Sequence, residues 1–181
     1  MTENWIADAL AAGLDPSSLK LHLQPVVSLA SDRIVGAESF IRWRDSLHGL
    51  VPPSDWIPLA ESTGAIVDCA LTALPLWTEC SNPGTGRLVS FNLDGRQLLA
   101  AEFMDAMLEI PAEVAAGLAV EIPYLQFTAD WANRVALEHR AQLEFAQHAG
   151  VELAQGFLYA APLTPSAFAA YVHAHARTAL G

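Results

Sequence analysis

The sequence predicts one α/β domain over residues 1–181, with a mainly parallel sheet whose first strand is antiparallel. Strand-forming runs alternate with helical segments along the chain, which is typical of βαβ units. The first two strands are joined only by a turn at Ser31 and Asp32, which is too short for a parallel crossover. At 181 residues the chain can form one sizeable core and is too short for two ordinary domains.

The first elements are a helix and the antiparallel strand pair. Residues 3–13 place apolar side chains at helical spacing before Asp15-Pro16 ends the pattern. Residues 19–29 and 34–43 are rich in strand formers. The second run is nearly continuous in apolar residues, which indicates a strand buried on both faces.

Two helices and a strand follow. Ser54 is expected as the N-cap of the first helix, which ends at Gly64. Residues 66–80 form the second helix, which we expect to be interrupted at Pro75 because proline lacks a backbone N–H. Residues 87–93 then alternate as a strand.

The C-terminal half continues the alternation of helices and strands. Residues 128–148 contain neither Gly nor Pro and are mostly good helix formers, so one continuous helix is predicted there. The other expected elements are a helix at 97–108, strands at 118–122 and 151–159, and a last helix at 165–177.

The composition is apolar and acidic. Hydrophobic residues make up 52% of the chain, charged residues 16%, and the net charge is −11. Such a chain repels polyphosphate, so nucleic acid and anionic membranes are not expected as partners. No apolar run approaches the roughly 18 residues needed to span a bilayer. The apolar excess either marks a surface for a partner or reflects an alanine-rich genome.

The cysteines and the N-terminus predict a cytoplasmic location. Cys69 and Cys80 form neither a CxxC pair nor a metal-ligand spacing, so two reduced thiols are expected. The N-terminus lacks the basic start and apolar stretch of a signal peptide.

One run carries the most specific motif of the chain. Residues 36–43, GAESFIRW, resemble GAEALLRW, the signature strand of EAL domains, a family of cyclic di-GMP phosphodiesterases. Further runs resemble other family motifs in the same order: LHLQPVV at 21–27, HGLV at 48–51, PSDWIPLAE at 53–61, SFNL at 90–93, VEI at 120–122, QLEF at 142–145 and QGFLY at 155–159. The resemblance covers residues 19–125 and 141–172.

The resemblance implies an incomplete TIM-barrel-like fold. Complete barrels typically need about 250 residues, so this chain is roughly 70 short. The shortfall falls between Ile122 and Val151, where the family has strands ending in paired aspartates and in a lysine that is its presumed base. About two or three central strands are therefore expected to be missing. A remnant of a family strand around residues 135–138 is the alternative to the helix predicted over 128–148.

The resemblance also implies positions for metal and ligand. Glu38, Asn92 and Glu121 match three metal-ligand positions, and each falls near the carboxyl end of a predicted strand. The alternative is that they are inherited polar residues now tied to neighbouring backbone. The other matches are to ligand-contacting positions: Gln24, Arg42 and Pro162. Arg42 could equally be a solvated or ion-paired arginine at a strand end.

No catalytic residues are expected. The sequence has no Asp-Asp pair, its only lysine is Lys20, upstream of the strand at 21–27, and Tyr124 stands where the family has a second glutamate. A two-metal site needs carboxylates bridging both ions, so turnover is not expected. No cofactor is expected beyond residual, weak Mg²⁺ binding.

An opened barrel needs a cover. Its interior is expected to be lined by Leu21, Leu23, Ile41, Phe91, Val120 and Leu158. A protein partner or a second copy of the chain is expected to cover the open side. The leading hypothesis is thus an inactive regulatory interaction module, with weak or absent cyclic di-GMP binding. A receptor that binds cyclic di-GMP without hydrolysing it and an active phosphodiesterase are the alternatives.

Overall fold

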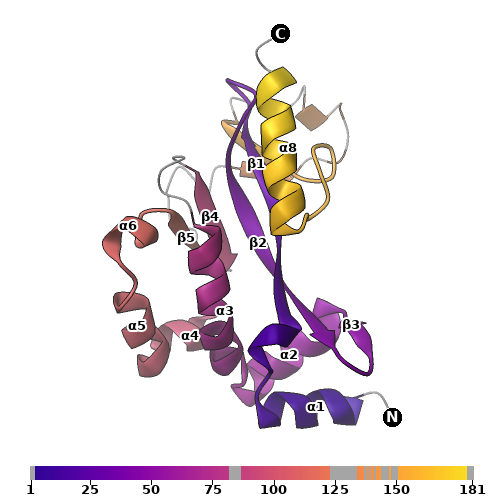
Figure 1. Ribbon diagram of the computed structural model, residues 1–181, viewed down its shortest axis with the longest axis vertical. Coiled ribbons are helices and arrows are strands. Elements are labelled where there is room, and N and C mark those ends of the chain that lie inside the picture. The colour runs from indigo at the N-terminus through magenta and orange to yellow at the C-terminus, as the bar shows by residue number, and fades with distance from the viewer. Residues whose placement is uncertain are drawn as a thin grey trace.

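A long antiparallel hairpin forms the centre of the fold in the computed structural model (Figure 1). The structure describes residues 3–81, 87–122, 134–136, 138, 140, 142–143, 147 and 151–178. Strands β1 (Leu19–Ser28) and β2 (Arg33–Asp45) pair from Leu19 opposite Trp43 to Ser28 opposite Arg33. Asp32 in the turn has φ 50°, in the left-handed region that aspartate tolerates better than most residues. The predicted antiparallel pair is confirmed.

The other strands extend the sheet on both sides of this hairpin in the order β5-β4-β2-β1-β7-β6. β4 (Leu88–Asn92) is parallel to β2, and β5 (Leu118–Glu121) is parallel to β4. β7 (Leu153–Gln155) is antiparallel to β1, and β6 (Arg134–Ala136) is parallel to β7. A short β3 (Gly49–Val51), which was not predicted, pairs antiparallel with β2. In the described residues β5 and β6 are the two ends of a curled, incomplete barrel, as the sequence predicted.

Local signals fix most of the helices. The bounds are α1 (Glu3–Ala12), α2 (Pro53–Thr63), α3 (Ile66–Cys80), α4 (Gly95–Leu99), α5 (Ala101–Leu108), α6 (Ala112–Ala115) and α8 (Pro165–Thr178), with a 3-10 turn η1 (Pro16–Ser18). Gly64 ends α2 in the left-handed conformation, as predicted. A capping box formed by Asp94 and Gln97 begins α4.

Three helix predictions were wrong in detail. Pro52, not Ser54, is the N-cap of α2, and the Ser54 hydroxyl donates to the Asp55 carboxylate instead. Pro75 lies inside a continuous α3 on its exposed side, so it does not interrupt the helix. The helix predicted over 97–108 is two helices, because Ala100 between them has extended backbone angles.

The single helix predicted over residues 128–148 is wrong where the structure describes that segment as a strand. β6 occupies Arg134–Ala136, so the alternative of a remnant strand near 135–138 is confirmed at its first residues. Helical backbone is described only at residues 140, 142–143 and 147, and residue 138 is neither helix nor strand. The rest of the segment beyond β6 lies outside the described residues. The last strand is also shorter than the predicted 151–159, since β7 ends at Gln155.

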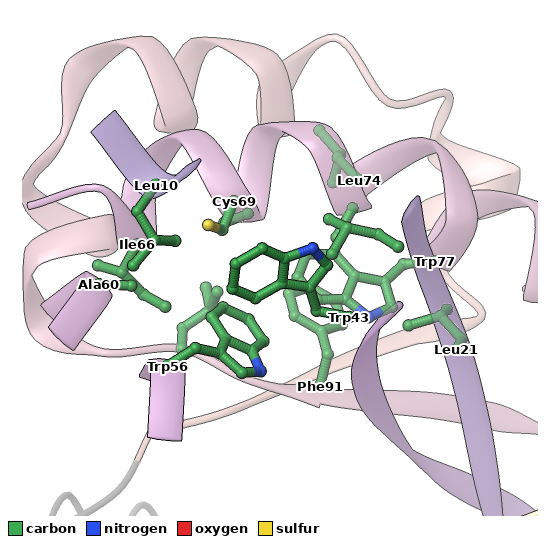
Figure 2. Close-up of a cluster of buried hydrophobic side chains, with 14 of the residues drawn as sticks. Leu10, Leu21, Trp43, Trp56, Ala60, Ile66, Cys69, Leu74, Trp77 and Phe91 are labelled. Atoms are coloured by element: carbon green, nitrogen blue, oxygen red, sulfur yellow. The ribbon is translucent and has the colours of Figure 1, made fainter. Parts of the chain in front are cut away.

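The core lies between the sheet and the helices on one of its faces. Figure 2 shows Trp43, Trp56, Trp77 and Phe91 among the buried side chains. The Trp77 and Phe91 rings stack with centroids 4.2 Å apart, and Trp56 meets Trp43 edge-on at 6.0 Å. A smaller cluster against α8 contains Leu23, Ala37, Val89 and Phe168.

The predicted lining of the barrel interior was wrong. Leu21 and Phe91 are buried in the helix-side cluster, where Ile41 packs against them. Val120 is paired in register with Phe91 and so shares its face. Leu23 is buried beside α8, and Leu158 packs near Ala154 beyond the end of β7. The alternation of side chains along each strand predicts two faces of the sheet. It does not predict which of the two faces the helices cover.

Among the described residues, no single helix is long and apolar enough to cross a membrane. α2 and α3 meet that test only when taken together, and they are bent by 120° relative to each other.

Candidate functional site

The face of the sheet opposite the helices is polar. Gln24 pairs in register with Glu38, and Glu38 with Ser90 on the neighbouring strand. Asn92 pairs with Glu121 one strand further along. Residues opposite each other on adjacent strands point to the same side of the sheet. All five therefore share one face. Asn92 and Glu121 are the last residues of β4 and β5, whereas Glu38 lies in the middle of β2 and not near its carboxyl end as predicted.

Glu38 is the centre of this polar face. Its side chain is 7% exposed. Asn92 Nδ2 donates to Glu38 Oε1 at 2.8 Å, and Gln155 Nε2 donates to Glu38 Oε2 at 2.6 Å. Hydrogen bonds to an ionised carboxylate are stronger than those between neutral groups. Both oxygens that could face a cation therefore already accept a strong hydrogen bond.

Gln155 is a site residue to which the sequence reasoning gave no role. It begins the run QGFLY, and that motif was the available signal. Its Nε2 holds Glu38, while its Oε1 is buried and has no hydrogen-bond partner among the described residues. The side chain connects β7 to β2 across β1.

The three predicted metal-ligand positions do come together, on three adjacent strands. Glu38 lies on β2, Asn92 on β4 and Glu121 on β5, with Asn92 bonded to Glu38 and in register with Glu121. Within the described part of the chain, no group of three or more His, Cys, Asp or Glu side chains could hold a metal ion. Two carboxylates and one amide, with Glu38 already bonded on both oxygens, do not fit a centre with two ions.

Two of the predicted ligand-contacting residues hold the segment after β7 against β1. Gln24 Nε2 donates to the Ala160 carbonyl at 3.0 Å. Pro162 accepts a hydrogen bond from the His22 ring through its backbone. Leu23 and Leu163 exchange two backbone hydrogen bonds next to these contacts. In this structure Gln24 and Pro162 therefore serve the packing of the C-terminal segment.

Arg42 lies at the edge of the polar face in a small basic group. It pairs in register with Lys20, which lies inside β1 and not upstream of it as the sequence reasoning had it. Arg42 Nη1 donates to the Ile41 carbonyl at 3.0 Å, and the guanidinium lies 5.5 Å from the centre of the Phe40 ring. Burial and then the charge of Arg42 lower the pKa of His22, against the hydrogen bond to Pro162, which raises it. His22 is therefore neutral at pH 7.

A pocket of about 610 Å³ opens beside this basic group. Its lining includes Phe40, Arg42, Asn92 and Asp94, together with Glu61 from α2. The volume falls in the range of about 300–1,000 Å³ that small-molecule sites occupy. Arg42 and Asn92 thus share one pocket, whereas Glu38 and Gln24 do not line it.

These features define the class of the protein. An open, curled sheet with helices on one face and polar side chains at the carboxyl ends of its parallel strands is an incomplete barrel, and barrel proteins build their sites at this edge. The family model of the EAL domain matches residues 4–140, and the chain belongs to this family.

Curated relatives match this chain over part of its length. The bifunctional diguanylate cyclase/cyclic di-GMP phosphodiesterase MucR of Pseudomonas aeruginosa is 31% identical over 105 residues, which is 54% of this chain and 15% of MucR. The oxygen sensor protein DosP of Escherichia coli is 45% identical over 58 residues, which is 32% of this chain and 7% of DosP. The chain thus corresponds to a small part of each relative.

Solved structures agree with the fold. The EAL enzyme Bd1971 in its cGMP-bound form gives a TM-score of 0.75 at 14% identity, covering 94% of this chain and 69% of that chain. The MucR phosphodiesterase in complex with c-di-GMP gives 0.62 at 20% identity, covering 91% of this chain and 99% of that chain. At these identities the likeness shows the fold alone.

Proposed function

We propose that this EAL domain is a regulatory module of cyclic di-GMP signalling that has no turnover and acts by binding a protein. The observation that carries the proposal is the state of Glu38, whose two carboxylate oxygens accept hydrogen bonds from Asn92 and Gln155. A carboxylate held in this way serves the sheet as a structural group. Neither oxygen of this carboxylate is left without a hydrogen bond for a cation to replace.

The rest of the sequence supports the absence of turnover. Metal-assisted phosphodiester hydrolysis uses ions about 3.5–4 Å apart, held by carboxylates that bridge them. No two aspartates are adjacent anywhere in the chain, and Lys20 is its only lysine. Lys20 lies beside Arg42 on an exposed part of β1, at the basic edge of the polar face.

The open side of the barrel supports a protein partner. β5 and β6 are the end strands of the sheet in the described residues. Val120 on β5 is 41% exposed, and Phe157, which follows β7 closely, is 66% exposed. An exposed apolar side chain, that of Val120, therefore lies on one end strand of the sheet, where another chain would cover it. The occupant we propose is a second copy or a cytoplasmic protein, and free thiols at Cys69 and Cys80 suit that compartment.

Turnover is tested by incubating the purified chain with cyclic di-GMP and Mg²⁺ and measuring the linear dinucleotide product. We expect no hydrolysis above that of a Glu38→Ala control. Hydrolysis that Glu38→Ala abolishes would show a working site and overturn this part of the proposal.

The partner surface is tested by light scattering on the purified chain. If a second copy covers the opening, Val120→Glu should shift the chain toward the monomer. Leu108→Glu is the matched control, because Leu108 is 79% exposed on α5, outside the strands of the sheet. A dimer that both variants leave unchanged would place the interface elsewhere. If the wild type is a monomer, the proposed occupant is a different protein. A search for that protein would use Val120→Glu as the non-binding control.

A second function, a receptor that binds cyclic di-GMP without hydrolysing it, rests on a separate observation. The pocket of about 610 Å³ combines Arg42 with Asn92 and Phe40, and Lys20 lies next to Arg42. Two cations beside an aromatic ring suit a phosphate and a base. Calorimetry with cyclic di-GMP decides this function: micromolar affinity that Arg42→Ala abolishes supports it, and no measurable heat excludes it.

A further inference from the structure

A crevice between α3 and α8 lies on the helix-covered side of the sheet, away from the polar face. Figure 1 shows the two helices standing apart along the central strands. The crevice has a volume of about 370 Å³. Its floor is Leu23, Ala37 and Val89, and Cys80 of α3 and Phe168 of α8 line its sides. Most of this lining is apolar, and its charged residues are Glu79 and Arg87.

A second, smaller pocket adjoins one end of the crevice. It has a volume of about 200 Å³ and lies where α8 approaches the turn between β1 and β2. Arg87 and Val172 line both spaces, so the two are neighbours. Arg33 and His175 complete the basic lining of the smaller pocket. An apolar space thus ends in a basic one.

The basic end has few acidic groups to neutralise it. Within the described part of the chain, neither Arg33 nor Arg87 forms an ion pair, and Arg87 Nε donates only to the Ile34 carbonyl at 3.3 Å. His175 Nε2 donates to the Asp32 carbonyl at 2.8 Å, with the Asp32 carboxylate 3.8 Å away. That carboxylate is 72% exposed, and it is the one acidic side chain lining this pocket.

Two neighbouring arginines are unusual in a chain as acidic as this one. Lysine and arginine total 9 against 20 acidic residues. Arg33 begins β2, and Arg87 precedes β4, the parallel neighbour of β2, so the sheet brings the two arginines together. Guanidinium groups match the planar geometry of carboxylates and phosphates. The basic end therefore suits the head group of an anion.

We propose that the two spaces together bind a small amphiphilic anion, a medium-chain alkyl carboxylate or its alkyl phosphate counterpart. The anionic head lies between Arg33 and Arg87, and the chain lies along Leu23, Val89 and Phe168. Each methylene buried on this floor strengthens binding about fourfold. The ligand would bridge α3 and α8 and thereby fix the last helix of the fold against the sheet.

The test is isothermal titration of the full chain with octanoate. We expect binding at one site, with acetate, which has the head alone, and 1-octanol, which has the chain alone, each binding about tenfold more weakly or worse. Octyl phosphate distinguishes the two head groups: tighter binding than octanoate assigns a phosphate, and weaker binding assigns a carboxylate. Absence of octanoate binding at millimolar concentration would overturn the proposal.

Three variants test the assignment of head and chain. Arg87→Gln should weaken octanoate binding about tenfold or more, because it removes one charge-assisted contact. Arg96→Gln on α4 removes the same charge from an exposed position outside the crevice and should change nothing. Ala169→Phe, on the exposed part of α8 that lines the crevice, should block the chain without altering charge.

Folding is monitored by circular dichroism. If Arg87→Gln does not fold, Arg33→Gln replaces it, since Arg33 is exposed at the start of β2. Octanoate affinity unchanged by the arginine variant and by Ala169→Phe would place the ligand elsewhere and refute the assignment.

Discussion

Replacing Glu38 by alanine distinguishes a structural carboxylate from a leftover metal ligand. The side chain is 7% exposed and accepts hydrogen bonds from Asn92 and Gln155. A hydrogen bond to a charged group contributes about 1.5–3 kcal/mol to stability. Asn92 is exposed and can turn its amide to water, whereas the Gln155 donor would stay between strands without an acceptor.

We therefore expect Glu38→Ala to lower the free energy of unfolding by about 2–3 kcal/mol, counting mainly the Gln155 bond. For a domain of this size the midpoint of thermal unfolding should fall by about 4–12 °C. If Glu38 were a functional carboxylate without such partners, its replacement by alanine would raise the free energy of unfolding. Removing an unpaired buried charge commonly stabilises the fold.

The assay is urea unfolding followed by the fluorescence of the five tryptophans, with and without Mg²⁺. Glu109→Ala is the control, since Glu109 is exposed at the end of α5 and its loss should change stability by no more than about 0.5 kcal/mol. Two results would refute the reasoning: a Glu38→Ala variant as stable as the wild type, or Mg²⁺ stabilising the wild type but not the variant.

Three further predictions concern the fold. Trp77→Leu and Phe91→Leu should show a coupling of about 0.5–1.5 kcal/mol in a double-mutant cycle, because the rings stack 4.2 Å apart; additive effects would contradict the stack. Gly64→Ala should destabilise the fold by about 1 kcal/mol, because alanine is strained at a φ of 87°. Gly95→Ala, in α4, should stabilise the fold by about 0.4–1 kcal/mol. Both positions have open space for a methyl group, so thermal melts of the two variants compare backbone strain alone. Burial raises the pKa of Cys69 to about 11, so the thiol ionises at lower pH in the unfolded chain than in the folded one. Between pH 9 and pH 11 the free energy of unfolding of the wild type should therefore fall by about 2–3 kcal/mol relative to Cys69→Ala. Parallel curves of stability against pH for the two proteins would exclude this ionisation.

Features that depend on neighbours in the sequence could be predicted. The β1–β2 hairpin follows from a turn at Ser31 and Asp32 that leaves no room for a crossover. Gly64 ends α2 because a residue without Cβ adopts the left-handed conformation freely. The incomplete barrel followed from a resemblance between motifs, and the family match agrees with it.

Features that depend on distant parts of the chain could not be predicted. β6 is three residues long and lies in a stretch of good helix formers; it is a strand because it pairs with β7, and the local pattern does not contain that pairing. The structure places the predicted positions Glu38, Asn92 and Glu121 on adjacent strands, and their role as metal ligands stays a prediction. Gln155 received no role, because its contact with Glu38 joins residues 117 positions apart.

Short strands at both ends of the sheet limit how tightly another backbone can attach there. β5 has 4 residues and β6 has 3, against 13 in β2. Only every second residue of a strand turns its N–H and C=O outward, and each hydrogen bond gained contributes about 0.5–1.5 kcal/mol. Added main-chain pairing at either end would be easily undone, so side chains such as Val120 would have to supply most of the affinity. An assembly built in this way exchanges its partners readily, which is what a reversible signal requires.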